Sequence, residues 1–242
     1  QPTGGKYDGV FGIWYGKGPG VDRSGDAIKH LNYDGTSQYG GVLLVAGDDH
    51  GAKSSTLPHQ SEPAFMAAGV PVFHPAGVQE YLDLGLHGFA MSRFSGCAVG
   101  FKAVGETVES SASVNIDPEA VQIAKQIDFH MPDGGLNLRY PDGVMEKESR
   151  LLEHKLPAAQ AYVRANGLDK LIFDSPKARL GIVTTGKAYL DVRQAFDELG
   201  LTAEMAADMG IRLYKVAMTW PLEPHGALEF AKGLEEIVVV EE

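Results

Sequence analysis

Residues 47–55 read GDDHGAKSS and follow the apolar run GVLLVA directly. Asp48, Asp49, His50 and the later His59 are residue types that ligate divalent metals. Adjacent aspartates on a strand point to opposite faces, so a shared metal would need a turn between them. No H-x-x-x-H or H-E-x-x-H pair supports zinc. We therefore expect no metal to be held by this chain alone.

The same stretch could contact an anion instead. Lys53, Ser54 and Ser55 offer an ammonium group and two hydroxyls. Ser55 or Ser61 could equally cap the helix that follows, because serine is a favoured first residue. From the residues alone, ligand contact and structural turn are both open.

Two glycine-containing turns invite a phosphate-binding interpretation. In GKGPG (16–20) the lysine precedes the turn and no Ser or Thr follows a Gly-Lys, so neither a Walker loop nor G-x-G-x-x-G is present. We interpret it as a sharp strand-to-helix turn at the carboxyl edge of a sheet, where open α/β sheets bind ligands. TTGK (184–187) opens a second helix after a strand, and capping is its simpler role.

Short apolar runs alternate with amphipathic segments along the whole chain, which favours parallel sheets covered by helices. The runs at 8–16 and 41–49 are typical of strands buried on both faces. Residues 116–150 are rich in Pro, Gly and Asp and predict a linker, followed by a helix over about 145–166. The other strands are expected at 70–75, 97–104, 179–186, 211–220 and the C-terminal EEIVVVEE, with helices at 78–93, 187–200 and 225–233.

The fold predicted from this order is α/β, with two three-layer α/β/α units and mainly parallel sheets. A hydrophobic content of 44% allows a sizeable core, and a net charge of -11 argues against sequence-independent nucleic-acid binding. The one cysteine, Cys97, is interpreted as a small core residue, and it cannot form a disulfide or hold an iron–sulfur cluster within this chain. We expect a cytoplasmic protein that has no membrane segment and is a piece of a longer polypeptide.

Six long stretches carry a family resemblance, and together they cover nearly all of the chain. They resemble the 2-oxoacid:ferredoxin oxidoreductases, closest to the fused-type indolepyruvate ferredoxin oxidoreductases. The stretches are GIWYGKGPGVDRSGDAIKH, GDDHGAKSSTLPHQSE, PAGVQEYLDLGLHGFAMSR, ETVESSASV, ARLGIVTTGKAYLDVRQA and VAMTWPLEPHGALEF.

The resemblance implies a division of the chain. Residues 1–115 would be the later part of a thiamine diphosphate pyrimidine-binding-type domain. Residues 116–177 would be a linker with a helix, and residues 178–242 a transketolase C-terminal-like α/β domain. We expect exposed apolar surface wherever strands of a partner domain would pair.

The resemblance also implies a chemistry. The complete enzyme would use thiamine diphosphate and Mg²⁺ to decarboxylate an arylpyruvate oxidatively, with indolepyruvate as the expected 2-oxoacid. The acyl group would pass to coenzyme A, and the electrons would reach ferredoxin through [4Fe-4S] clusters housed elsewhere. The activating glutamate, the diphosphate domain and the cluster cysteines are expected outside this chain, so the chain alone should be inactive. Its partners would be the remaining domains or subunits in a homo-oligomer, with no nucleic acid or membrane.

The same resemblance places the loop after the GDDH strand, and the GKGPG turn with Asp22, at the cofactor pocket. Two alternatives remain: a non-catalytic binding or assembly module of the same fold, and a Mg²⁺-dependent hydrolase using Asp48, Asp49 and His50. The expected cofactor-binding residues are Lys17, Gly18, Gly20, Asp48, Asp49, His50, Ser54 and Ser55, and the expected substrate-pocket residues are Lys53, His59 and Gln60.

Overall fold

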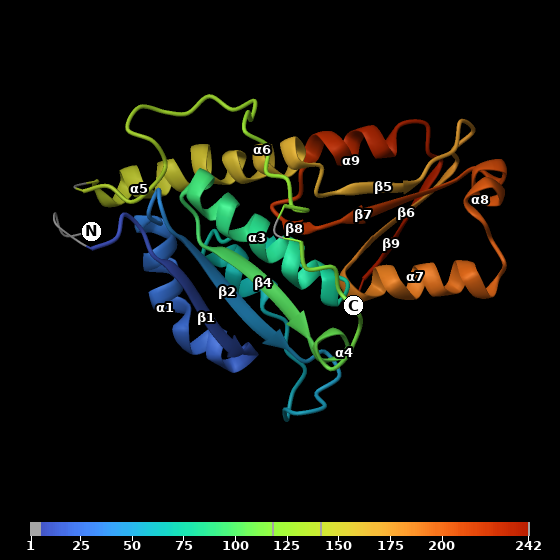
Figure 1. Ribbon diagram of the computed structural model, residues 1–242, viewed down its shortest axis with the longest axis horizontal. Coiled ribbons are helices and arrows are strands. Elements are labelled where there is room, and N and C mark those ends of the chain that lie inside the picture. The colour runs from blue at the N-terminus through green and yellow to red at the C-terminus, as the bar shows by residue number, and fades with distance from the viewer. Residues whose placement is uncertain (1–5, 118, 141, 242) are drawn as a thin grey trace.

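The computed structural model describes residues 6–117, 119–140 and 142–241, which form two sheets covered by helices (Figure 1). The first sheet has five strands in the order β1-β2-β4-β3-β8. Its parallel strands are β1 (Phe11–Lys17), β2 (Gly41–Asp48), β4 (Val99–Val104) and β3 (Val72–Phe73), and β8 (Met218–Trp220) runs antiparallel to β3.

Helices cover both faces of the first sheet because its central strands point apolar side chains toward both faces. Leu43 of β2 packs into a core with α3 (Val78–Ser95) and α6 (Leu156–Asn166). The next residue, Leu44, packs into the opposite core with α1 (Gly18–Asp34) and α2 (Glu62–Ala67). A short helix, α4 (Gly105–Val108), follows β4 directly. This layering confirms the three-layer arrangement predicted for the first unit.

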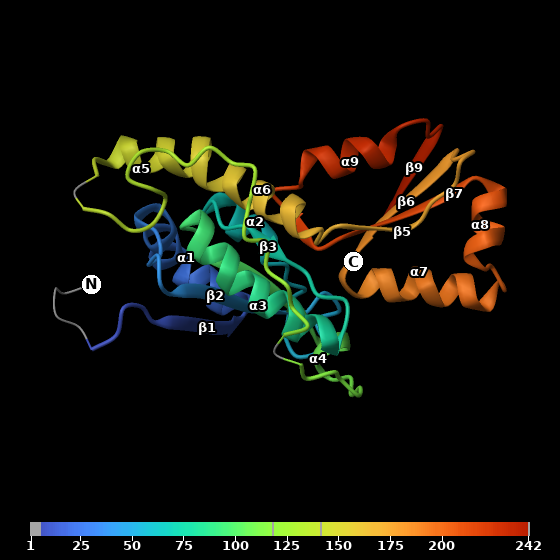
Figure 2. The same ribbon diagram turned by 45° about the horizontal axis from the view of Figure 1, so that its top comes forward.

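The second sheet has four strands in the order β5-β7-β6-β9. Leu213 of β7 packs toward α7 and α8, and the adjacent Tyr214 stacks on Phe230 of α9. Figure 2 shows α7 and α9 on opposite sides of this sheet. The elements are β5 (Lys170–Phe173), β6 (Leu180–Thr185), α7 (Gly186–Glu198), α8 (Ala203–Met209), β7 (Ile211–Val216), α9 (Pro224–Ala231) and β9 (Glu236–Val240).

The chain does not pass from the first unit to the second at the predicted boundary, because strands of the two sheets follow one another along it. The strand predicted over 211–220 divides at Ala217: β7 belongs to the second sheet and β8 to the first. Asp169 accepts a hydrogen bond from the amide of Ala217 at 2.7 Å, where the chain changes sheets. β5, which lies within the segment 116–177 predicted as a linker, pairs antiparallel with β7. The second sheet therefore begins before residue 178.

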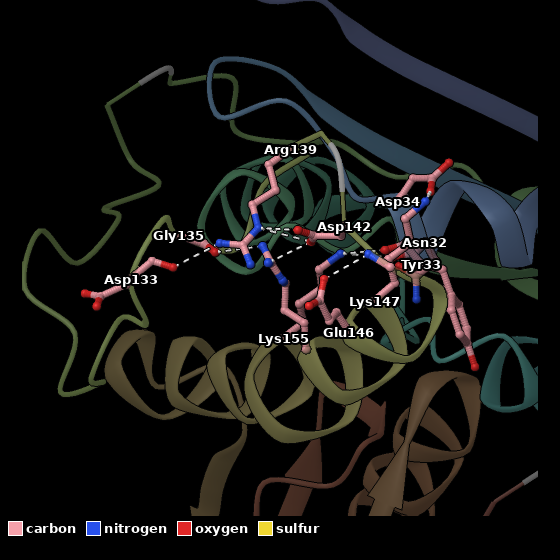
Figure 3. A network of polar contacts seen from close by, with 12 residues as sticks. Asn32, Tyr33, Asp34, Asp133, Gly135, Arg139, Asp142, Glu146, Lys147 and Lys155 are labelled. Atoms are coloured by element: carbon pink, nitrogen blue, oxygen red, sulfur yellow. Dashed lines mark hydrogen bonds and ion pairs between the residues drawn. The ribbon is translucent and has the colours of Figure 1, made fainter.

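The Pro/Gly-rich segment before residue 144 is anchored to the first unit, because Asn137 donates to the carbonyl of Arg93 at 2.8 Å and the amide of Leu138 donates to that of Thr36 at 2.9 Å. The carboxylate of Asp142 forms ion pairs with Arg139 at 2.8 Å and with Arg150 at 2.7 Å. Arg150 also donates to the carbonyl of Gly135 at 3.2 Å. The buried Lys155 donates to the carbonyls of Asn32 and Tyr33, which α1 leaves unpaired at its C-terminal end (Figure 3).

The helix predicted over 145–166 is confirmed, with one irregularity. It runs through α5 (Val144–Arg150), one wide turn (Leu151–Lys155) and α6, and ends at Gly167 in the left-handed conformation that glycine favours. The wide turn carries Lys155, whose ammonium group reaches the end of α1. In the described part of the chain no helix is long and apolar enough to span a membrane.

β1 differs from its prediction as a strand buried on both faces. Among the described residues it is an edge strand that pairs with β2 alone. Phe11 is 55% exposed, Ile13 61% and Tyr15 82%, all on one face, whereas Trp14 packs under α1 on the other. The apolar run predicted the strand correctly, but burial of its outer face depends on what packs there.

Candidate functional site

The turn from β1 to α1 brings two distant motifs together. Lys17 ends β1, and Gly18 begins α1 without an intervening loop, as predicted for GKGPG. The imidazole of His59 lies against Gly18, where a Cβ would meet Nδ1 at 2.0 Å. Gly18 therefore has a steric role, because only the absence of a side chain lets the loop 48–60 settle on this turn.

His59 lies between two carboxylates of different character. Its Nε2 is 2.9 Å from Oδ2 of the largely exposed Asp22, and its Nδ1 is 3.6 Å from Oδ1 of the buried Asp48. Asp48 also accepts hydrogen bonds from the amide of Ser61 at 2.9 Å and from its hydroxyl at 2.5 Å. The series Asp22–His59–Asp48–Ser61 links the surface to the interior at the carboxyl end of β2.

Asp49 has a separate role from Asp48, as the opposite directions of adjacent strand residues predict. Its carboxylate accepts hydrogen bonds from the amides of Lys53 at 2.9 Å and Ser54 at 2.8 Å. These two hydrogen bonds, of which the one from the Ser54 amide has the larger effect, hold the pKa of Asp49 below its usual value. Asp49 therefore shapes the turn and stays ionised at neutral pH.

The tip of this loop is tied to both neighbouring strands. Lys17, at the end of β1, donates to the hydroxyl of Ser55 at 3.3 Å. Lys53 pairs with Glu106 of α4 at 2.6 Å, and that bond raises the pKa of Lys53 and lowers that of Glu106. The loop thus bridges the carboxyl ends of β1, β2 and β4, which are adjacent in the sheet.

A second group of polar residues lies where the two sheets meet. Gln60 lines a cavity of about 300 Å³ together with Glu62, Lys102, Thr185 and Trp220. His74, at the end of β3, is 2% exposed and lines it too. Burial, with the nearby Lys102, lowers the pKa of His74 to about 3, so its ring is neutral at physiological pH.

The predicted site residues thus divide into two places. Lys17, Gly18, Asp48, Asp49, Lys53, Ser54, Ser55 and His59 meet around one loop, whereas Gln60 faces the junction cavity. Gly20 lies in the first turn of α1 beside Trp14. His50 is partly buried, and burial followed by the Lys102 cation lowers its pKa. Among the described residues, no group of three or more His, Cys, Asp or Glu is arranged to hold a metal ion.

Sequence reasoning overlooked several residues of these two places. Ser61, one of two candidates for capping the next helix, lies at the N-cap position of α2, but its hydroxyl donates to Asp48 and makes no cap bond. Glu106, His74 and Lys102 were not singled out. His74 and Glu106 follow the ends of β3 and β4, so their positions at the carboxyl edge were a signal that could have found them.

Comparison with known proteins shows which proteins this chain is similar to. Residues 170–242 match the model of the indolepyruvate oxidoreductase domain. The chain is 23% identical over 234 residues to indolepyruvate oxidoreductase subunit IorA of Methanothermobacter marburgensis, covering 97% of this chain and 36% of that protein. It is 25% identical over 229 residues to the same subunit of Pyrococcus abyssi, covering 92% of this chain and 33% of that protein. The chain therefore spans about a third of the length of the curated relatives it matches.

A solved structure supports the fold over the same span. The 2-oxoglutarate:ferredoxin oxidoreductase from Magnetococcus marinus superimposes with a TM-score of 0.62 at 13% identity, covering 97% of this chain and 46% of that one. Both α/β units fall within this match, which confirms the predicted fold class. With residues 170–242 matched by the family model and nearly all of its length matched by IorA subunits, the chain is similar to the indolepyruvate oxidoreductase subunits IorA.

Proposed function

We propose that this chain is a segment of a thiamine diphosphate-dependent 2-oxoacid:ferredoxin oxidoreductase acting on an arylpyruvate, with indolepyruvate as the preferred substrate. The observation that carries the proposal is the match of 97% of the chain to IorA subunits. The division into part of a pyrimidine-binding-type domain and a transketolase C-terminal-like domain belongs to the same proposal. Coenzyme A, ferredoxin and the iron–sulfur clusters would act through the complete enzyme.

The loop 48–60 fits one wall of a cofactor pocket, but it does not fit a complete cofactor site. Its polar groups are largely engaged with one another, Asp49 with the loop amides and Lys53 with Glu106. The ammonium group of Lys17, at the end of β1, and the hydroxyl of Ser55, in the loop, are both accessible to a ligand because neither residue is buried. A diphosphate and its Mg²⁺ would need further donors from another domain.

In this proposal the chain's own residues position the pocket. When bound, thiamine diphosphate supplies the electron sink for decarboxylation. Asp48 and Ser61 fix the base of the loop, and Gly18 with His59 fixes its contact to α1. Lys17 and Ser55 would orient ligand groups at the carboxyl edge of β1 and β2, where open α/β sheets place their ligands.

The proposal is tested by expressing the coding region on both sides of this segment together with its partner subunit. Ferredoxin should then be reduced in the presence of indolepyruvate, coenzyme A and thiamine diphosphate. Ser55→Ala should lower turnover while leaving thermal unfolding unchanged, and Ser113→Ala, at an exposed serine outside the loop, is the control. No ferredoxin reduction with any arylpyruvate would refute the proposal, and an unchanged turnover in Ser55→Ala would refute the pocket assignment.

A further inference from the structure

The cavity between the two sheets has a wall made by an ion pair. Lys102 of β4 donates to Oε1 of Glu62, the first residue of α2. Lys102 is 4% exposed, so its charge is removed from water and depends on this partner. Both residues line the cavity, which therefore meets one positive and one negative group side by side.

The second oxygen of Glu62 is the unusual feature of this pair. Oε2 is buried, yet it accepts no hydrogen bond from any residue that the structure describes. A buried carboxylate oxygen without a donor costs free energy, and a ligand N–H group would recover it once the carboxylate turns this oxygen toward the cavity. Glu241 adds a second carboxylate to the lining, and His74 adds no charge because its ring is neutral.

One wall of the cavity is apolar, and Gln60, Thr185 and Thr219 add uncharged polar groups elsewhere in the lining. Trp220 of β8 and the side chains of Pro63 and Met66 from α2 supply the apolar wall. A volume of about 300 Å³ is at the lower end of the range of small-molecule sites, which is suited to a compact ligand. The lining lies at the carboxyl end of β3 and β6, the edge at which α/β sheets bind ligands.

We propose that this cavity binds a free α-amino acid with an apolar side chain. Its ammonium group would donate to Oε2 of Glu62, its carboxylate would lie against the ammonium group of Lys102, and its side chain would pack on Trp220 and Met66. A zwitterion matches the ion pair charge for charge, whereas an inorganic anion would face Glu62 and Glu241. The site shares only Gln60 with the proposed cofactor loop among the described residues, and its occupant would join the two units because β8 and Thr185 line it together with β4 and α2.

The test is calorimetric titration of the 242-residue chain without any cofactor. L-phenylalanine should bind saturably. Phenethylamine lacks the carboxylate and 3-phenylpropionate lacks the ammonium group, so each should bind at least about tenfold more weakly, the loss expected for one charged hydrogen bond. No saturable binding of L-phenylalanine, or equal binding of either analogue, would overturn the proposal.

Variants locate the site. Glu62→Gln should weaken L-phenylalanine binding by about tenfold or more. Glu229→Gln, an exposed glutamate of α9 paired with Lys232, is the matched control and should bind as the wild type does. Because Glu62→Gln leaves Lys102 without its carboxylate and could disturb folding, Met66→Trp fills the apolar wall without changing a charge and should also block binding. Unchanged affinity in Met66→Trp would place the ligand elsewhere and overturn the assignment.

Discussion

The imidazole of His59 occupies the space that a side chain at Gly18 would need. A Cβ at position 18 would lie 2.0 Å from Nδ1 and 2.1 Å from Cγ of that ring, a distance at which one of the two groups has to move. The contact joins the first turn of α1 to the loop after β2, and it holds His59 within reach of Asp22 and Asp48.

We predict that Gly18→Ala destabilises the chain by about 1–3 kcal/mol, the range for inserting a methyl group into a packed site. Gly20→Ala is the matched control, because a Cβ there would meet Trp14 at an ordinary 3.9 Å. Alanine is up to about 1 kcal/mol more favourable than glycine within a helix, so Gly20→Ala should be neutral or stabilising. Urea unfolding measures both, and equal stability of the two variants would show that the His59 contact is dispensable.

Asp169 predicts a pH dependence of stability. Burial raises its pKa from 3.8 to about 6, against the hydrogen bonds from the amides of Ala217 and Met218, which lower it. The folded state therefore holds this proton more tightly than the unfolded state. Its contribution is fully present below pH 3.8 and is lost as the pH rises through about 6.

Asp169→Asn should remove that dependence while keeping an oxygen for the two amides. The free energy of unfolding of the wild type minus that of the variant should fall by up to about 3 kcal/mol between about pH 4 and pH 7. Asp197→Asn, an exposed position of α7, serves as the control and should leave the wild-type pH profile unchanged. A constant difference between wild type and Asp169→Asn across this range would contradict the raised pKa.

Most strands and helices, and the turn after β2, could be predicted from the sequence because short-range patterns of residues determine them. Leu43 and Leu44 belong to an apolar run, which is typical of a strand buried on both faces, and β2 is such a strand in the interior of the sheet. The opposite roles of Asp48 and Asp49 follow from the two-residue period of a strand. Gly167 could be recognised as a helix end because glycine tolerates the left-handed conformation.

Other features depend on contacts between residues far apart, which local patterns do not encode. Ser61 looked like a helix cap, but its hydroxyl bonds to Asp48, thirteen positions earlier. The cavity between the two sheets is lined by both Lys102 and Thr185. The chain passes from the second sheet to the first at Ala217, and no local pattern in the sequence marks that change. Phe11 and Tyr15 belong to an apolar run of the kind found in buried strands. They are exposed because the order of strands in the sheet places β1 at its edge.

The ion pair between Glu80 and Lys215 joins the two units and should be strongly coupled. Lys215 of β7 is 5% exposed and lies 4.7 Å from the centre of the Tyr189 ring, and Glu80 belongs to α3. Glu80→Gln would leave a buried ammonium group without its carboxylate, which costs about 3 kcal/mol. The double variant Glu80→Gln/Lys215→Met should recover part of that loss.

The pH dependence of the Glu80→Gln variant provides a second measurement. Burial lowers the pKa of Lys215 to about 8, so above that pH the amine is neutral and needs no carboxylate. The destabilisation by Glu80→Gln should therefore shrink as the pH rises from 7 to about 9. Glu229→Gln breaks an exposed pair with Lys232 and should cost no more than about 1 kcal/mol at either pH. Additive effects of the Glu80 and Lys215 substitutions would rule out the coupling.

The open face of β1 predicts binding of a hydrophobic dye. Ile13 lines an apolar cleft of about 560 Å³ with Leu82, Leu86 and Phe89 of α3, and it is 61% exposed. Exposed apolar patches beside an unpaired strand edge mark surfaces that other segments cover, which agrees with relatives about three times longer than this chain. The wild-type chain should therefore enhance the fluorescence of anilinonaphthalene sulfonate under native conditions.

Ile13→Ser/Tyr15→Ser should reduce that fluorescence, and because both side chains are largely exposed each substitution should change the free energy of unfolding by no more than about 0.5 kcal/mol. Leu152→Ser removes a similarly exposed leucine, 55% exposed, from the wide turn between α5 and α6, which does not line the cleft. It should leave the dye signal unchanged. If Leu152→Ser lowers the fluorescence as much as the β1 variant does, the dye reports general looseness of the chain and the cleft is not its site.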